Sequence, residues 1–176
     1  MALISLCLVP TTQMLLRGYV MLNFSQTQAG WWEGLNRISG MYLSVITASF
    51  AVYYLPRLSE INNKKELKIE IFKCYKFLIP ILLFCCFSIY FLRVFIIRLL
   101  FTPEFLPMQV FFPWQMAGDF FKICSWLLSY LMIAKSLVKT YIVTEFFFSA
   151  SFLLFGFLFL HLNGVIGLTQ AYCLNY

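Results

Sequence analysis

The chain has 176 residues, of which 62% are hydrophobic and only 11% are charged, with a formal net charge of +6. Soluble domains average about 25% charged residues, so this composition excludes an ordinary soluble domain and predicts an integral membrane protein. The basic residues cluster at the ends of apolar runs, which argues against a nucleic-acid partner. The six cysteines show no zinc-site spacing and no disulfide framework, and we expect neither metal nor cofactor.

Six apolar segments follow one another along the chain. The first five are each long enough, at about 1.5 Å per residue, to cross a hydrocarbon core of about 30 Å, whereas the sixth is too short. The sequence therefore predicts an all-α, polytopic helical bundle with five full spans and a truncated sixth. The spans are expected at about 1–22, 31–56, 76–99, 111–133, 139–161 and 164–176. The first and last spans lack natural flanks, so we expect a fragment of a longer protein.

The connections between the spans alternate in charge. The first, residues 23–30, has no Lys or Arg, whereas residues 57–76 hold six. The fourth carries Lys135 and Lys139, and the fifth has neither Lys nor Arg. The positive-inside rule then makes the second and fourth connections cytoplasmic, and Met1 cytoplasmic as well.

We expect residues 57–75 to form a basic cytoplasmic loop. Its charges alternate in sign, which favours an amphipathic helix leading into the third span. Membrane lipid with anionic headgroups fits such a segment as a partner. The alternative is a solvated loop that only sets the topology, because the positive-inside bias by itself accounts for the charge.

Asp119 and Lys122 lie one helical turn apart in a segment that otherwise reads as membrane-buried. Each such charge costs roughly 2.5–3.5 kcal/mol at the centre of a membrane helix, so the pair is the best pointer to function. At about 100° per residue, both fall on one polar face together with Gln115, Trp126 and Ser129. The alternative is that the two charges simply neutralise each other at this spacing.

Two other spans carry polar side chains along one side. The fifth span has Glu145 on a side with Ser149 and Gly156. A longer stripe follows the second span and consists of Glu33, Arg37, Gly40, Ser44 and Thr47. Simple ion pairs, Arg37 with Glu33 or Glu145 with a nearby lysine, are the alternative to a functional role.

Catalysis finds little support in the sequence. A hydrolase needs a nucleophile beside a base, and the sole histidine, His161, is far from every polar face. No connection is long enough to hold a separate catalytic domain. Acidic and basic groups inside the membrane without catalytic partners favour transport, and we expect the chain not to be an enzyme.

Several motifs resemble a known family. Leu-Arg-Val-Phe-Ile-Ile-Arg-Leu-Leu-Phe-Thr-Pro-Glu-Phe (92–105) leads into Trp-Gln-Met-Ala-Gly-Asp-Phe-Phe-Lys-Ile (114–123) and Leu-Ser-Tyr-Leu-Met-Ile-Ala-Lys (128–135). Together with residues 29–39 and 46–59, these runs resemble the second half of bacterial O-antigen flippases. They resemble even more closely the lipid III flippases of enterobacterial common antigen, in the multidrug/oligosaccharidyl-lipid/polysaccharide exporter superfamily.

The resemblance implies a transporter with two similar six-helix lobes around a central cavity. Residues 1–176 would form the C-terminal lobe. The substrate would be an undecaprenyl-diphosphate-linked oligosaccharide, moved across the bacterial inner membrane for O-antigen or enterobacterial common antigen synthesis. The missing first lobe, in the same or a separate chain, would be the partner, because one lobe cannot build the cavity.

We expect six side chains to face this cavity: Arg37, Gln115, Asp119, Lys122, Ser129 and Tyr130. Arg37 and Lys122 would attract the diphosphate, while Asp119 keeps Lys122 charged and oriented. The polar neutral side chains would hydrogen-bond sugar hydroxyls, and Asp119 or Glu145 would titrate in ion coupling. A multidrug exporter lobe and a non-transporting membrane scaffold or inactive remnant stay open as alternatives.

Overall fold

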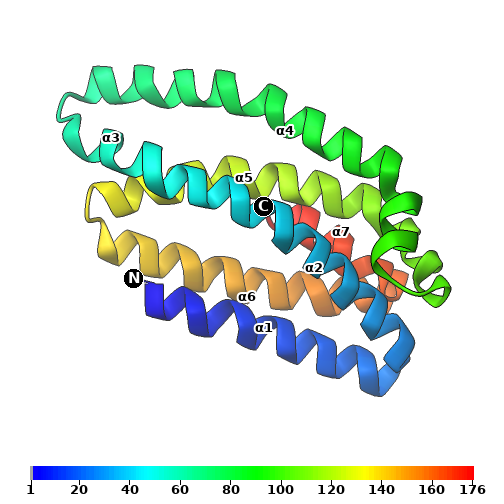
Figure 1. The fold of residues 1–176 in the computed structure, drawn as a ribbon. Coiled ribbons are helices and arrows are strands. Elements are labelled where there is room, and N and C mark those ends of the chain that lie inside the picture. Colours follow the sequence, from blue (N-terminus) through cyan, green and yellow to red (C-terminus); the bar gives the residue numbers. More distant parts are fainter. Residues whose placement is uncertain (1) are drawn as a thin grey trace.

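The computed structural model describes the backbone of residues 2–176 and the side chains from residue 8 onward. It is a bundle of helices that run side by side, without a strand in the described backbone (Figure 1). The helices are α1 (Ala2–Asn23), α2 (Gln26–Ser49), α3 (Leu55–Glu60), α4 (Lys64–Leu100), α5 (Phe112–Ala134), α6 (Val138–Asn163) and α7 (Ile166–Asn175). The all-α prediction is confirmed, whereas the predicted location of Met1 lies outside the described residues.

Four helical segments in the described part of the chain are long and apolar enough to cross a membrane. They are Gln26–Glu60, Lys64–Leu100, Pro103–Ala134 and Val138–Asn163. Large hydrophobic side chains on them face outward; Phe84 and Phe91 of α4, for example, are each 75% exposed. A lipid environment explains such exposure, since soluble proteins rarely leave large apolar patches uncovered. The chain is therefore a multi-pass membrane protein, while the number of spans and the six-helix lobe stay predictions.

Helices α2 and α3 form one continuous rod, because a π-helical stretch, Phe50–Tyr54, joins them. Pro56 lies just after this stretch, at the start of α3. A proline inside a helix lacks the N–H that would bond four residues back, and its ring clashes with that carbonyl. A wider π turn accommodates this defect, so the second span runs to Glu60 and not to residue 56.

The segment 57–75, predicted as a basic loop, is mostly helical. Only Ile61–Asn63 break the backbone helix between α3 and α4. The side chain of Asn63 caps α4 by accepting a hydrogen bond of 3.0 Å from the N–H of Lys65. The lysines of this segment therefore lie on the first turns of a 37-residue helix, which agrees with the predicted amphipathic helix and corrects the predicted loop.

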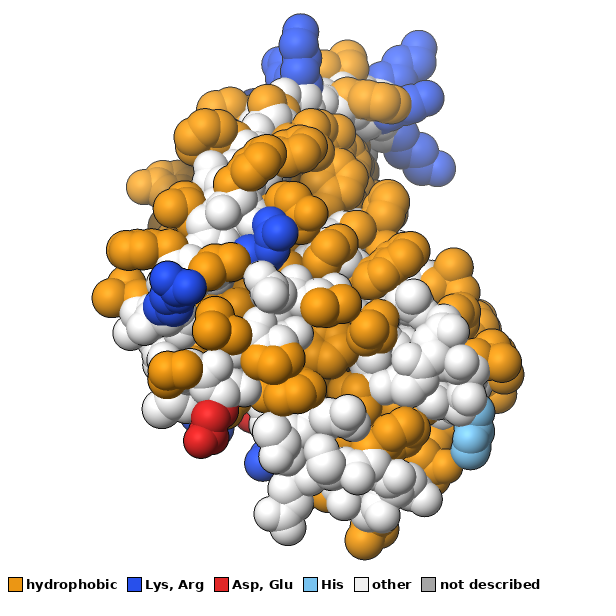
Figure 2. All heavy atoms as spheres, turned by 90° about the vertical axis from the view of Figure 1, so that its right-hand side faces the viewer, with side chains coloured by type: hydrophobic (Ala, Val, Ile, Leu, Met, Phe, Trp, Pro, Cys, Tyr) orange, Lys and Arg blue, Asp and Glu red, His pale blue; other side chains and the backbone are white. Residues whose placement is uncertain are grey.

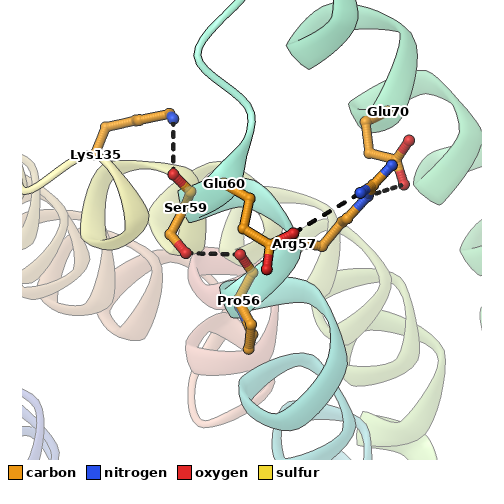
Figure 3. Close-up of polar contacts among 6 residues, drawn as sticks. All are labelled: Pro56, Arg57, Ser59, Glu60, Glu70 and Lys135. Carbon is orange, nitrogen blue, oxygen red and sulfur yellow. Dashed lines mark hydrogen bonds and ion pairs between the residues drawn. The ribbon is translucent and has the colours of Figure 1, made fainter.

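Polar contacts fasten this turn to its neighbours (Figure 3). The guanidinium of Arg57 lies 3.9 Å from the carboxylate of Glu60 and 3.8 Å from that of Glu70 on α4. From the turn after α5, the Lys135 ammonium donates to the backbone carbonyls of Ser59 and Ile61. The α3–α4 turn and the α5–α6 turn, which are the two basic connections, are thus joined at one end of the bundle.

Two buried apolar clusters hold the bundle together. One lies where α1, α2, α5, α6 and α7 meet; its fully buried members include Leu16, Leu35, Phe112, Leu160 and Leu168. The other lies between the α2–α3 rod, α4 and α5, around Leu58, Leu82, Ile123 and Leu127. Helix α5 contributes to both clusters, so it lies at the centre of the bundle.

Candidate functional site

Asp119 lies at the centre of a buried polar cluster. Its side chain is 0% exposed. Oδ2 accepts a hydrogen bond of 2.7 Å from the Ser39 hydroxyl and a short one from the Tyr42 hydroxyl. Oδ1 accepts one of 2.6 Å from the Tyr172 hydroxyl and a longer one of 3.4 Å from the Gln115 amide. We call these five residues the carboxylate centre. A buried carboxylate persists only with such partners, because leaving it unpaired in an apolar interior is very costly.

The donors to Asp119 come from three different helices. Ser39 and Tyr42 lie on α2 and Tyr172 lies on α7, so the carboxylate ties both of these helices to α5. Gly118 makes the close approach of α7 possible. A Cβ at this position would meet the ring of Tyr172 at less than 3.0 Å and the backbone of Cys173 at 3.2 Å. The glycine next to the aspartate therefore belongs to the same packing arrangement.

Lys122 lies one turn further along α5 and is surrounded by aromatic rings. Its Nζ is 5.1 Å from the ring centroids of Trp126 and Tyr172 and 5.2 Å from that of Tyr176. Cation–π attraction within about 6 Å of a ring stabilises an ammonium group by roughly 0.5–1 kcal/mol where water still reaches it. Tyr172 therefore contacts both groups, donating its hydroxyl to Asp119 and presenting its ring to Lys122.

The simple neutralisation of Asp119 by Lys122 does not occur as a direct ion pair. No nitrogen–oxygen contact within 4.0 Å joins them among the ion pairs of the described residues. The carboxylate turns toward α2 and α7, while the ammonium lies against the three rings. The two charges, although one helical turn apart, have separate surroundings.

A cavity of about 450 Å³ opens beside Lys122, between α5 and α6. Its wall includes Lys122, Ser129 and Tyr130 from α5 and Glu145 from α6, and we call it the α5–α6 cavity. Its volume falls within the roughly 300–1,000 Å³ typical of small-molecule pockets. Lys122 and Glu145 also line a smaller adjoining hollow. Neither Lys122 nor Glu145 forms an ion pair within 4.0 Å in the described part of the molecule.

The structure divides the six predicted cavity residues into three groups. Lys122, Ser129 and Tyr130 line the α5–α6 cavity. Gln115 and Asp119 are 1% and 0% exposed, lie inside the helix packing of this chain and do not line the α5–α6 cavity, so their place at a cavity between two lobes stays a prediction. The polar face of α5 is continuous on a helical wheel, but α2 and α7 cover its first turns and leave its later turns open.

Arg37 lies apart from both the carboxylate centre and the α5–α6 cavity. Its Nε donates to Glu33 at 3.3 Å, and the same carboxylate lies 3.8 Å from the guanidinium of Arg17 on α1. The Arg37 side chain is nevertheless 68% exposed. The alternative role in an ion pair with Glu33 is thus observed, and the second guanidinium leaves this group with a positive charge.

Three members of the carboxylate centre were not predicted from the sequence: Ser39, Tyr42 and Tyr172. Ser39 and Tyr42 lie on the side of α2 away from its conspicuous stripe, where Arg37, Gly40 and Ser44 are exposed. Tyr172 comes from the short α7 and meets Asp119 only through tertiary packing. The i, i+3 spacing of Ser39 and Tyr42 was the one available hint, since it puts two hydroxyls on one helix face.

Metal binding has no support in this arrangement. Among the described residues, no group of three or more His, Cys, Asp or Glu side chains could hold a metal ion. The α5–α6 cavity instead provides the Lys122 cation held by aromatic rings, the acidic Glu145 and several hydroxyls. Such a set suits binding of a polar or anionic ligand.

Comparison with known proteins gives a whole-chain similarity. The chain is 35% identical over all 176 residues to proteins named lipid III flippase from Escherichia coli (strain K12) and from Shigella flexneri. It spans 42% of the length of these curated relatives. No protein-family model matches the chain. No solved structure matches it either. The resemblance to the lipid III flippase family, which the sequence motifs indicated, is confirmed.

Proposed function

We propose that this chain forms the second lobe of a flippase for a lipid-linked oligosaccharide. The substrate would be an undecaprenyl-diphosphate carrying sugar units for enterobacterial common antigen or O-antigen, moved across the bacterial inner membrane. The whole-chain similarity to relatives named lipid III flippase supports this proposal. The first lobe of such a transporter, in the same or a separate chain, completes the central cavity.

The observation that carries the proposal is the half-buried Lys122 in the wall of the α5–α6 cavity. A diphosphate and a glycan are both costly to move through hydrocarbon, and a cationic group lowers that cost by pairing with phosphate. The ammonium of Lys122 is held by rings and not by a carboxylate. It therefore retains its capacity to bind an anion.

The neutral polar residues of the cavity supply hydrogen bonds to sugar hydroxyls in this proposal. Ser129 lines the cavity, as does Tyr130, whose hydroxyl donates at 3.2 Å to the carbonyl of Thr47. An oxygen that already donates still accepts, so Tyr130 would receive a hydrogen bond from a sugar. Arg37, exposed on α2, would meet the diphosphate or headgroup at another stage of its passage.

For ion coupling we favour Glu145 over Asp119. Glu145 lines both the α5–α6 cavity and the adjoining hollow, so solvent ions reach it. Asp119 is fully buried and receives hydrogen bonds from four side chains. Its role in the proposal is to position α2, α5 and α7, and through Tyr172 to hold the ring against which Lys122 lies.

The orientation belongs to the proposal as well. The α3–α4 and α5–α6 turns, joined by Lys135, would lie on the cytoplasmic side, because they carry most of the lysines. Rocking of one lobe against the other would then expose the α5–α6 cavity alternately to the two sides.

A chimera tests the proposal. The matching segment of the Escherichia coli relative is replaced by this chain, and surface display of enterobacterial common antigen is measured in cells that lack the relative. We expect the chimera to restore display and Lys122→Gln to reduce it by roughly tenfold or more, the worth of a charge-assisted hydrogen bond. Lys139→Gln, which removes an exposed lysine on α6 outside the cavity, is the matched control.

Membrane abundance of each chimera is measured in parallel, so that loss of protein is separated from loss of transport. Display that persists unchanged in Lys122→Gln would remove the anion-binding role of the cavity. A parent chimera that is abundant in the membrane but never restores display would contradict the flippase proposal itself.

A further inference from the structure

Helix α4 is too long for the membrane it crosses. Its 37 residues span about 55 Å at 1.5 Å per residue, against a hydrocarbon core of about 30 Å. A tilt of about 20°, which is usual for membrane helices, changes this little. The C-terminal part of α4 is the apolar part, so the first turns, from Lys64 to about Lys76, must lie in or beyond the headgroup layer.

The outward side of these turns mixes basic and apolar side chains. At about 100° per residue, five exposed residues fall within roughly 100° of one another. We call them the basic face: Lys65, Lys68, Ile69, Phe72 and Lys76. Ile69 is 55% exposed and Phe72 is 62% exposed. In Figure 2, the distant upper edge of the molecule, where α4 lies, shows projecting Lys and Arg side chains among hydrophobic ones.

The acidic residues of this region are already engaged elsewhere. Glu60 and Glu70 both contact Arg57 (Figure 3). Glu66 accepts a hydrogen bond of 3.3 Å from Asn63. No ion pair within 4.0 Å involves a lysine of the basic face in the described residues. The Lys68 ammonium lies 6.0 Å from the Phe72 ring, which keeps it near the apolar residues without neutralising it. Lys65, Lys68 and Lys76 of the basic face therefore remain available to pair with an anion.

We propose that the basic face binds the headgroups of anionic phospholipids. The lysines pair with lipid phosphates, while Ile69 and Phe72 insert between the upper acyl chains. Interleaved apolar and basic residues at the depth of the headgroups are the combination by which a helix recognises an anionic membrane surface. A site for free phosphate would have no use for exposed Ile and Phe, which is why we assign the face to lipid.

Lipid selectivity of the full chain, reconstituted in phosphatidylcholine bilayers, tests this proposal. Spin-labelled phosphatidylglycerol and spin-labelled phosphatidylcholine are compared by the fraction of each that the protein immobilises. We expect phosphatidylglycerol to be preferred roughly threefold, and the preference to fall to near unity in Lys65→Gln/Lys68→Gln/Lys76→Gln. The charge-matched control Lys64→Gln/Arg98→Gln/Lys139→Gln removes three exposed cations that lie outside the basic face. This control should keep the preference for phosphatidylglycerol.

Further arms separate this site from general electrostatics. The reversal Lys68→Glu/Lys76→Glu should disfavour phosphatidylglycerol, and excess inorganic phosphate at constant ionic strength should leave the parent preference unchanged. Equal losses in the triple variant and its control would overturn the proposal, as would a parent without preference. Abolition of the preference by inorganic phosphate would identify a free-phosphate site instead. Circular dichroism confirms that each variant remains folded.

Discussion

The carboxylate centre and the α5–α6 cavity lie one helical turn apart on the same face of α5, yet they differ in burial and in bonding partners. Asp119 is fully buried and its oxygens accept four hydrogen bonds. Lys122 is half-buried, lies against three rings and borders a cavity of about 450 Å³. One region holds helices together and the other is open to a ligand. A polar stripe inside a membrane helix thus does not by itself mark a binding surface, because neighbouring helices decide which turns stay open.

Asp119→Ala tests whether the buried carboxylate stabilises the packing of α2, α5 and α7. The change leaves the hydroxyls of Ser39, Tyr42 and Tyr172 without their acceptor in a dry interior. We expect the free energy of unfolding to fall by roughly 2–4 kcal/mol, because unsatisfied buried polar groups carry a full desolvation penalty. Thermal unfolding in detergent, followed by circular dichroism, measures the loss.

Glu145→Gln is the matched control for that change, since it neutralises a carboxylate at the wall of the α5–α6 cavity. We expect its unfolding free energy to stay within about 0.5 kcal/mol of the parent, as is usual for changes away from buried networks. Equal effects of the two substitutions would mean that the contrast between a closed and an open region is mistaken.

Gly118→Ala tests the close contact between α5 and α7. A Cβ there would meet the Tyr172 ring below 3.0 Å and the Cys173 backbone at 3.2 Å, so α7 must shift. We expect a loss of about 1–3 kcal/mol, the usual cost of overpacking. In Gly40→Ala the new Cβ has no neighbour within 4 Å, and alanine is the better helix former, so stability should rise by up to about 1 kcal/mol. Two losses of similar size would indicate that Gly118 does not set the packing.

The sequence was sufficient for the helical membrane class and the family resemblance. Hydropathy reports whether a segment is apolar, and it located α5 and α6 to within two residues at each end, whereas the predicted second span, 31–56, begins five residues after the start of α2. The junction at α4 was harder. The charged residues indicated a loop, but Lys and Glu are good helix formers, and Asn63 caps a helix that begins at Lys64.

The division of the polar face could not be predicted from one helix. Gln115 and Lys122 belong to the same stripe by periodicity, yet one is 1% exposed and the other lines a cavity. The difference arises because Ser39 and Tyr42 of α2 and Tyr172 of α7 cover the first turns. Helical spacing contains no information about such contacts, which join residues 53–80 positions apart.

Tyr172→Phe tests how strongly the carboxylate centre is coupled to the α5–α6 cavity. The substitution removes the hydroxyl that donates to Asp119 but keeps the ring beside Lys122. We expect a loss of about 1 kcal/mol, typical of one hydrogen bond between membrane helices, with little change in transport by the chimera. Tyr172→Leu, which removes the ring as well, should also reduce transport. If both variants transported equally well, the ring would have no part in positioning Lys122.

Lys122→Gln should have a small effect on stability but a large effect on transport. It removes cation–π contacts of a half-buried side chain but leaves no buried group unpaired, so we expect a loss of about 0.5–1 kcal/mol. Thermal unfolding and the display assay of the chimera measure the two quantities on the same variant. A large loss of stability would place Lys122 with Asp119 among the groups that hold the helices together. Unchanged stability with lost display would instead mean that the Lys122 ammonium binds a ligand, whereas the Asp119 carboxylate, one turn before it, only stabilises the helix packing.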